Sequence, residues 1–528
     1  MYNSNSAKKV NHPALISCFH HSILYFERAR GILYSLSRYI HSFPKVYSVT
    51  YTKQSKPVLF SHTLTESKSN IFFIISLSHF YRLIKTAVHL YTRTQKLFIT
   101  MSSEPIITSF LDTDAYKLHM QQAVFHSYRD VVASFEFNCR NKDDYLGVYA
   151  DEIQEQVNKM RDVFLTKEEY TYLLTLPHFK KDYIEYLKDY RYKPEQVQVT
   201  RIPPVLEPES AKFGEDGSKL RISVSGPWVE TILWEIPLLA IVSEVAQRRR
   251  HPECGVKQAM DSLNTKLEKF FAAHDEEELK HFKVSDFGTR RRFSKAVQEA
   301  VVTTLANHPR FKHILVGSSN YDIARRLGIP AVGTQAHEWF QAFQQLSPEL
   351  SLSQTEALKA WLHEYPFSLG IALTDCITMD AFLNDFNADL ANAYQGLRQD
   401  SGDPVRWGQK ALAHYKRLGI DAKKKVLVFS DGLNLETAVE LYNRFKDEVN
   451  VMCGIGTQLT CAIDGIRAMN IVLKMVRCQG KPVAKISDST GKVMCEDDEF
   501  VEQLCNAFNV ASPVTRATTI RQIPVASP

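Results

Sequence analysis

The stretch Lys425–Gly432, KVLVFSDG, shows the pattern that decides the fold. Four apolar residues form a short run, and Ser430, Asp431 and Gly432 follow it directly. A run of this length is typical of a buried strand, and turn residues at its end indicate that the chain then leaves the sheet. Similar runs recur at intervals of roughly 20 to 40 residues, a spacing typical of strand–helix units. They are FKVSDFGTRRR (282–292), HILVGSSN (313–320), PAVGTQAHEW (330–339), LGIALTDC (369–376), YQGLRQDSGD (394–403) and VMCGIGTQ (451–458), with MNIVLKMV (469–476) as a candidate eighth.

These repeats predict an α/β fold with a parallel sheet, because each run leads into a helical segment. Seven or eight units favour an irregular (β/α)8 barrel-like domain, which we place at 231–510. An open doubly wound sheet is the alternative. The glycine fingerprint GxGxxG, which commonly follows the first strand of such a sheet, is missing.

A smaller N-terminal α/β domain is predicted at 101–230. It begins with a helix over AYKLHMQQAVFHSY (115–128), for which Asp112 or Thr113 is a suitable N-cap. An apolar helix at 232–250 would join the two domains. The other expected elements are strands at 132–139, 196–202 and 219–226 and a mostly polar helical region at about 150–192.

Charge is distributed unevenly along the chain. Residues 1–100 hold 13 Lys and Arg but only two acidic residues, whereas the remainder holds 51 basic and 57 acidic residues. An acidic body has no general attraction to nucleic acid, so we exclude that partner. Nine cysteines without CxxC pairs or zinc spacing indicate free thiols in a reducing compartment, which favours the cytoplasm, with the nucleus as a further candidate location.

Residues 1–100 show no sustained strand or helix period. They could form an organellar targeting segment, a poorly ordered extension, or an upstream region translated ahead of a natural start at Met101, which we favour. The apolar run IFFIISL (71–77) is too short to span a bilayer, so no membrane role is expected. We assign no chemistry to this extension or to the C-terminal tail at 511–528.

Polar side chains cluster directly after almost every apolar run. In a barrel, the carboxyl ends of the strands share one face, and that face carries the active site. A lone histidine at a helix start is ordinarily a packed polar residue. Here, however, polar clusters follow seven of the runs, and this repeated placement favours an active site. The predicted rim contains Asp286, Arg290, Ser318, His337, Asp375, Arg398, Asp400, Asp431 and Gly454.

Two rim segments have features of phosphate sites. The backbone N–H groups around Gly454 and Gly456, with the Thr457 hydroxyl, could cradle a phosphate, although an ordinary tight turn fits as well. Arg290 and Arg291 lie in DFGTRRR, and guanidinium groups match phosphate oxygens, although a surface basic run would look the same.

The segment GLRQDSGDP (396–404) combines an arginine with two aspartates. Arg398 could hold a substrate carboxylate, while Asp400 and Asp403 could accept ribose hydroxyls or help to hold a metal. Alternatively, Ser401 or Asp403 caps a helix that starts at Pro404. The residues thus suit a substrate with a sugar, at least one phosphate and a separate anion, without naming a reaction.

Taken in order, LDTDAYKLHM, DFGTRRR, GSSNYDIARRLGIPAVGTQAHEW, GIALTDC, GLRQDSGDP and GIGTQLT resemble the nicotinate phosphoribosyltransferase family, over about 101–510. The resemblance implies a type II phosphoribosyltransferase that converts nicotinate and phosphoribosyl pyrophosphate to nicotinate mononucleotide and pyrophosphate. This is the first step of NAD salvage from nicotinate. ATP would be a co-substrate and Mg²⁺ would accompany the phosphates, held mainly by their oxygens and by water.

The resemblance also implies roles for individual residues. His337 would be transiently phosphorylated by ATP, as a neutral imidazole near pH 7 permits. Glu338 is expected to orient its ring, and Asp400 to act with it in catalysis. The remaining assignments are Tyr116, Thr334 and Arg398 to nicotinate, Thr457, Gly454, Gly456, Arg290 and Arg291 to phosphoribosyl pyrophosphate, and Asp375 and Asp403 to support of the site.

Three other functions are weighed against this one. A related transferase would act on nicotinamide or quinolinate, but Arg398 with Thr334 favours a monocarboxylate. A barrel lyase or isomerase would use His337 as acid and base on a sugar phosphate. A silent metabolite sensor has no reason to keep His337, Arg398 and Asp400 together. The family resemblance further implies a homodimer, in which the small domain of one chain completes the neighbouring site.

Overall fold

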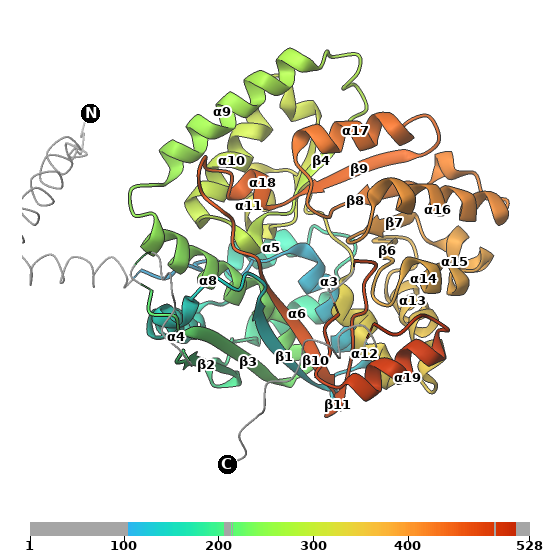
Figure 1. The fold of residues 1–528 in the computed structure, drawn as a ribbon, viewed down its shortest axis with the longest axis horizontal. Helices are drawn as coiled ribbons and strands as arrows, with labels where there is room; N and C mark the ends of the chain where they lie inside the picture. Colours follow the sequence, from blue (N-terminus) through green and yellow to red (C-terminus); the bar gives the residue numbers. More distant parts are fainter. Residues whose placement is uncertain (1–103, 205–212, 214, 490–492, 514–528) are drawn as a thin grey trace, which may run out of the picture. The chain divides into compact units, whose positions relative to one another are not determined.

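The computed structural model describes residues 104–204, 213, 215–489 and 493–513, which belong to one compact unit. The predictions for residues 1–100 and for most of the C-terminal tail lie outside the described residues. The unit contains a larger parallel sheet and a smaller antiparallel sheet, as Figure 1 shows.

The larger sheet confirms the strand–helix repetition. Its six strands are all parallel, in the order β5-β4-β9-β8-β7-β6. Each overlaps the apolar part of a predicted run, and polar residues lie at or directly after its carboxyl end. The strands are β4 (Val284–Asp286), β5 (Leu315–Ser318), β6 (Ile371–Leu373), β7 (Gly396–Gln399), β8 (Val426–Phe429) and β9 (Asn450–Ile455).

Helices connect these strands and surround the sheet in Figure 1. Asp403 caps the helix that starts at Pro404, where it accepts a hydrogen bond of 2.7 Å from the Arg406 N–H. The helices are α9 (Val256–Ala273), α10 (Lys295–Asn307), α11 (Tyr321–Leu327), α12 (His337–Leu346), α13 (Ser353–Glu364), α14 (Met379–Asp385), α15 (Ala388–Ala393), α16 (Pro404–Arg417), α17 (Leu435–Phe445), α18 (Thr457–Thr460) and α19 (Asp498–Ala507).

Two predicted barrel strands differ in the structure. The run after Pro330 forms only an isolated parallel bridge, from Ala331 to Ser318. The Thr334 hydroxyl then donates to the Ile371 carbonyl at 2.7 Å, so this segment contacts both edge strands of the sheet, β5 and β6. The run 469–476 is not an eighth barrel strand, because it forms β10 (Ile471–Cys478) and pairs with the smaller sheet.

The smaller sheet is antiparallel, in the order β11-β10-β1-β3-β2. Three of its strands match the predicted ranges to within one residue. The other two come from the C-terminal part of the chain, which thereby returns to the N-terminal domain. Its strands are β1 (Val132–Cys139), β2 (Val197–Ile202), β3 (Lys219–Pro227), β10 and β11 (Lys481–Pro482).

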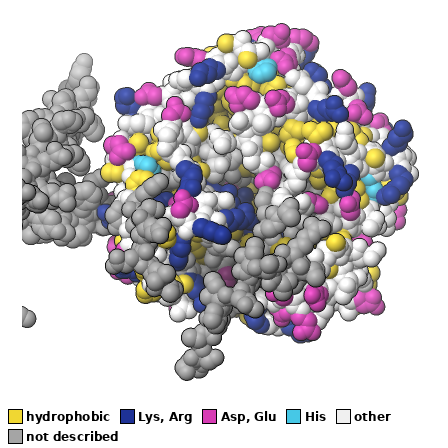
Figure 2. Space-filling model, viewed as in Figure 1, with side chains coloured by type: hydrophobic (Ala, Val, Ile, Leu, Met, Phe, Trp, Pro, Cys, Tyr) yellow, Lys and Arg dark blue, Asp and Glu magenta, His cyan; other side chains and the backbone are white. Residues whose placement is uncertain are grey.

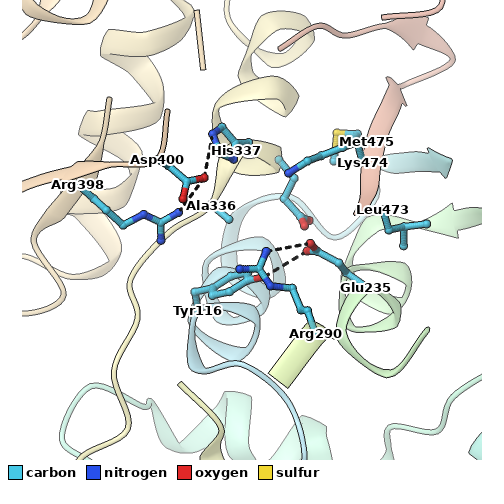
Figure 3. Close-up of a pocket in the computed structure, with 11 residues that line it drawn as sticks. Tyr116, Glu235, Arg290, Ala336, His337, Arg398, Asp400, Leu473, Lys474 and Met475 are labelled. Atoms are coloured by element: carbon cyan, nitrogen blue, oxygen red, sulfur yellow. Dashed lines mark hydrogen bonds and ion pairs between the residues drawn. The ribbon is translucent and has the colours of Figure 1, made fainter. Parts of the chain in front are cut away.

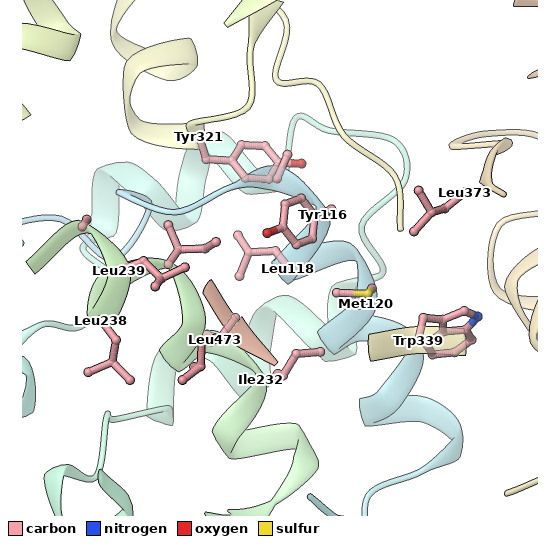
Figure 4. Close-up of a cluster of buried hydrophobic side chains, with 14 of the residues drawn as sticks. Tyr116, Leu118, Met120, Ile232, Leu238, Leu239, Tyr321, Trp339, Leu373 and Leu473 are labelled. Carbon is pink, nitrogen blue, oxygen red and sulfur yellow. The ribbon is translucent and has the colours of Figure 1, made fainter. Parts of the chain in front are cut away.

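A helical layer lies between the two sheets. Helix α8 (Glu235–Arg250) is buried from Glu235 to Gln247, as expected of a helix that is apolar on all sides. Figure 4 shows side chains of α3, α8 and β10 in one cluster with Trp339 and Leu373 of the larger domain. The remaining helices are α3 (Ala115–Ser127), α4 (Ala150–Lys159), α5 (Lys167–Leu173), α6 (Lys181–Asp189) and α7 (Trp228–Thr231).

The start of α3 differs from the predicted capping. Asp114 occupies the N-cap position, and Asp112 instead accepts two hydrogen bonds from the buried Arg292 guanidinium, at 2.7 and 3.0 Å. Burial opposes ionisation of Asp112, but Arg292 and Lys295 outweigh it and hold its pKa below the ordinary value. The pair therefore attaches the segment before α3 to the loop after β4.

We predict that Arg292→Met lowers the free energy of unfolding by about 3–5 kcal/mol, because the buried Asp112 carboxylate loses the guanidinium that donates two hydrogen bonds to it. Urea unfolding followed by circular dichroism measures this. The control is Arg161→Ala, which breaks an ion pair with both side chains more than 60% exposed, at 64% and 65%, and should cost less than about 1 kcal/mol. Equal losses in the two variants would contradict the assignment.

Candidate active site

One pocket lies where the two domains meet, at the carboxyl ends of the parallel strands. Figure 3 shows its side chains converging from the larger sheet, from α3, from the start of α8 and from β10. The lining residues are Tyr116, Glu235, Arg290, Ala336, His337, Glu338, Arg398, Asp400, Leu473, Lys474 and Met475.

His337 is the first residue of α12 and is 3% exposed. Its Nε2 lies 2.9 Å from Oδ1 of Asp375 and 3.7 Å from Oδ2 of Asp400. Burial lowers the pKa of the imidazole to about 4, with Lys485 adding to the effect and Asp375 opposing it. The ring is therefore neutral at pH 7. Since a carboxylate only accepts hydrogen bonds, Nε2 carries the proton and Nδ1 keeps a lone pair.

Asp375 orients this ring. Its second oxygen accepts a hydrogen bond from the Ser401 hydroxyl at 2.6 Å and pairs with Nζ of Lys485 at 2.9 Å. Burial raises the pKa of the carboxyl, but Lys485 and His337 outweigh this and keep it well below the ordinary value. Asp375 lies just after β6, at the strand end where the sequence predicted rim residues. This strand end therefore supplies the carboxylate that orients His337.

Glu338 does not orient the ring, contrary to our prediction. Because it is the next residue on α12, its side chain leaves the helix in another direction. Its carboxylate is bound by the buried Lys117 ammonium and by Nε1 of Trp228, the latter at 2.9 Å. Lys117 also pairs with Glu235 at 2.7 Å.

Arg398 lies in β7, Asp400 directly follows the strand, and both line the pocket. Nη2 of Arg398 lies 3.8 Å from Oδ2 of Asp400, which also pairs with His337. The Arg398 side chain is 13% exposed, and its buried Nε has no hydrogen-bond partner among the described residues. A guanidinium with an unused buried donor is suited to an anionic ligand.

Arg290 and Tyr116 form the opposite wall. Nε of Arg290 lies 3.3 Å from Asp114, its Nη1 lies 3.7 Å from Glu235, and its guanidinium carbon lies 5.7 Å from the Tyr116 ring centre. The Tyr116 hydroxyl donates to Glu235 at 3.5 Å. The aromatic ring thus comes from α3, which belongs to the small domain.

The glycine-containing turn lies beside this wall and not in the pocket lining. Gly454 packs under the Phe287 ring, where an added Cβ would lie 2.3 Å from ring carbons. Gly456 precedes Thr457, the first residue of α18, and the Thr460 hydroxyl donates to the Gly288 carbonyl at 3.0 Å. The two predicted phosphate segments are therefore neighbours.

Other predicted residues have internal partners. Nε of Arg291 donates to the Ile471 carbonyl at 2.9 Å, and burial next to Arg290 lowers its pKa to about 10. Thr334 lies outside the pocket lining, with its hydroxyl bound to Ile371. Asp286 and Ser318 are buried and bind one another at 2.7 Å, so they support the rim from within.

Sequence reasoning missed Glu235, Lys117, Lys474 and Lys485. Lys474 interrupts the apolar run 469–476, and this was the available signal, because a lysine in a buried strand needs a polar environment. In the structure it faces the pocket from β10, and burial lowers its pKa to about 8. Figure 2 shows Lys and Arg side chains gathered in the hollowed centre of one face.

Comparison with known proteins gives one consistent family. A model of the nicotinate phosphoribosyltransferase family matches residues 282–512, and a model of its N-terminal domain matches 111–243. The chain is 55% identical over 412 residues to a nicotinate phosphoribosyltransferase of Citrobacter koseri, covering 78% of this chain and 98% of that one. A relative of the same name from Yersinia pestis is 55% identical over 410 residues, with the same coverage.

Solved structures agree. A nicotinate phosphoribosyltransferase from Vibrio cholerae superposes with a TM-score of 0.72 at 39% identity, over 79% of this chain and 97% of that one. One from Porphyromonas gingivalis gives 0.68 at 29% identity, over 77% and 100%. No helix in the described part of the chain has the length and hydropathy needed to cross a bilayer.

We predict that the His337 imidazole does not titrate between pH 5.5 and 8, since a pKa of about 4 leaves it neutral throughout this range. Long-range ¹H–¹⁵N spectra measure this, with His337→Gln to assign the signals. In urea-unfolded protein, the same ring should gain its proton near its ordinary pKa of about 6.5. A midpoint near 6.5 in the folded protein would contradict the prediction.

Proposed function

The chain belongs to the nicotinate phosphoribosyltransferase family, and on that premise we propose that its pocket couples phosphoribosyl transfer to ATP hydrolysis through a phosphohistidine at His337. Family membership assigns it to NAD biosynthesis as a nicotinate phosphoribosyltransferase. The observation that carries the proposal is the buried, neutral His337, oriented by Asp375 and lying in the same pocket as Arg398.

In this proposal Arg398 binds the carboxylate of nicotinate. Its unused Nε and its position at the pocket wall support this role. The Tyr116 ring stacks on the pyridine ring from the opposite wall. The orientation directs the ring nitrogen towards the phosphoribosyl group, so much of the catalytic effect comes from positioning. Thr334 is assigned to nicotinate by the family resemblance alone, because it lies outside the pocket lining and its hydroxyl already donates to the Ile371 carbonyl.

The phosphates of phosphoribosyl pyrophosphate then occupy the basic side of the pocket. Arg290 and Lys474 line it, and the turn containing Gly454, Gly456 and Thr457 lies beside Arg290. Arg291 keeps its charge near neutral pH and adds to the positive potential. In the transfer step, the ring nitrogen forms a bond to C1′ of the ribose as the bond to pyrophosphate breaks. The arginines stabilise the charge on the leaving pyrophosphate.

His337 is phosphorylated at Nδ1. Its lone pair attacks the γ-phosphorus of ATP, the bond to the β-phosphate oxygen breaks, and ADP leaves. Because Nε2 keeps its proton, the phosphorylated ring carries positive charge, which the carboxylates of Asp375 and Asp400 stabilise. Water later displaces the phosphoryl group, which releases phosphate and restores the neutral ring.

The family resemblance also implies Mg²⁺. Whether a pocket carboxylate could bind this ion depends on whether the carboxylate already has partners within the protein. Asp375 is committed to Lys485 and Ser401, whereas Asp400 is 29% exposed and faces the pocket. Asp400 is therefore the residue suited to hold Mg²⁺ beside the phosphates. When bound, the ion neutralises phosphate charge. The homodimer stays a prediction.

We predict that Arg398→Ala raises the KM for nicotinate about 10- to 100-fold, since it removes charge-assisted hydrogen bonds to the carboxylate. The KM for phosphoribosyl pyrophosphate should change much less. The matched control is Arg406→Ala, an exposed arginine on α16. Steady-state kinetics measure this, with nicotinamide as a substrate lacking the carboxylate. An unchanged KM for nicotinate would make the carboxylate assignment wrong.

Incubation with γ-³²P-labelled ATP should give an acid-labile, base-stable label on the protein and nicotinate mononucleotide in solution. His337→Asn should remove the label, and ³¹P NMR should identify the Nδ1 isomer. Product without label would keep the transferase but make His337 a binding residue. Absence of both label and product would contradict the proposed coupling.

A further inference from the structure

A second buried histidine, His119, lies close to the segment that leads into His337. It is fully buried on α3, one turn after Tyr116. Its Nδ1 lies 2.9 Å from the Gly333 carbonyl, and its Nε2 lies 2.6 Å from the Tyr321 hydroxyl. Neither the proposed chemistry nor substrate binding uses this residue.

The hydrogen bonds around His119 have one consistent direction. Since a carbonyl accepts, Nδ1 carries the proton and donates to Gly333, which leaves Nε2 to accept from the Tyr321 hydroxyl. Nε2 of His178 lies 3.0 Å from that hydroxyl and 3.2 Å from Nε2 of His119, so it fits as the N–H donor that completes the group. Burial keeps the pKa of both rings low, to about 4 for His178, so the neutral forms fit.

Helix α3 contacts the segment 333–338 at several further points. The Ala336 N–H lies 3.4 Å from the Met120 sulfur, and the Lys117 ammonium binds Glu338. Gly333 has a φ of +143°, and a Cβ there would lie 3.3 Å from the Tyr116 nitrogen. Four residues in the first two turns of α3, Tyr116, Lys117, His119 and Met120, therefore lie against the segment that contains His337.

We propose that His119 is a positioning residue, whose Nδ1–H fixes the Gly333 carbonyl and thereby sets His337 relative to Tyr116. Without this bond, the partly buried Gly333 carbonyl loses its partner, and the segment 333–336 loses one of its attachments to α3. The inference rests on the proposed phosphohistidine, because its effect is on phosphorylation of His337.

The test compares three variants of the full chain by single-turnover labelling with γ-³²P-labelled ATP. His119→Leu removes both hydrogen bonds and should slow labelling about tenfold or more. His119→Asn can keep a donor near the Nδ1 position and should restore most of the rate. Tyr321→Phe keeps the ring but loses the hydroxyl, and should slow labelling about three- to tenfold.

The matched control is His414→Leu. His414 is also a buried histidine bound to a carbonyl, that of Phe386 at 2.7 Å, and it lies outside the pocket lining. This variant should lose thermal stability but label at the wild-type rate. A common loss in His119→Leu and His414→Leu would make the effect one of stability alone and overturn the proposal.

The remaining outcomes separate the two hypotheses. Label retained in His337→Asn means that the phosphohistidine itself is wrong. If that variant loses the label but His119→Leu labels at the wild-type rate, the positioning role is wrong and the phosphohistidine stands. If His119→Leu does not fold, Tyr321→Phe decides, and a wild-type rate in it overturns the proposal.

Discussion

The site depends on one buried cation, the Lys117 ammonium, which is held between the carboxylates of Glu235 and Glu338. A fully buried ammonium is costly unless it is paired, so the three elements that carry these residues must meet. Burial raises the pKa of Glu338, while Lys117 and Arg290 overcome burial to keep that of Glu235 low. The arrangement joins α3, α8 and α12, and through them the small domain to the helix that begins at His337.

This constraint brings the proposed ring-stacking residue, Tyr116, and the proposed phosphorylated residue, His337, into one pocket. Tyr116 precedes Lys117 and His337 precedes Glu338, so each partner of the ion pair carries a functional neighbour into position. The parallel sheet supplies the other side, with Arg398 and Asp400 at the end of β7. The C-terminal part of the chain returns as β10, and its Lys474 completes the pocket lining. The pocket therefore belongs to both sheets, although its residues are far apart in the sequence.

Much of the framework was predictable from local pattern. The parallel strands were visible because short apolar runs end in turn residues, and Asp403 was readable as a cap because Pro404 follows it. The strands of the smaller sheet alternate strongly enough to locate three of them. The run 469–476 was assigned to the wrong sheet because the sequence of a buried strand has the same apolar pattern in a parallel or an antiparallel sheet. Only its pairing with β1 shows that it belongs to the smaller sheet. Asp112 was misread as a cap because its partner, Arg292, is distant in sequence.

The sequence by itself determined the strand–helix order, the polar residues at the strand ends and the family motifs, since these depend on neighbouring residues. Only the tertiary structure decided which charges meet. Nothing near His337 in the chain shows that Asp375, and not the adjacent Glu338, binds its ring, or that Lys485 comes back to hold that aspartate. Buried polar groups must find partners, and the partners are chosen by the packing of the whole chain and not by sequence proximity.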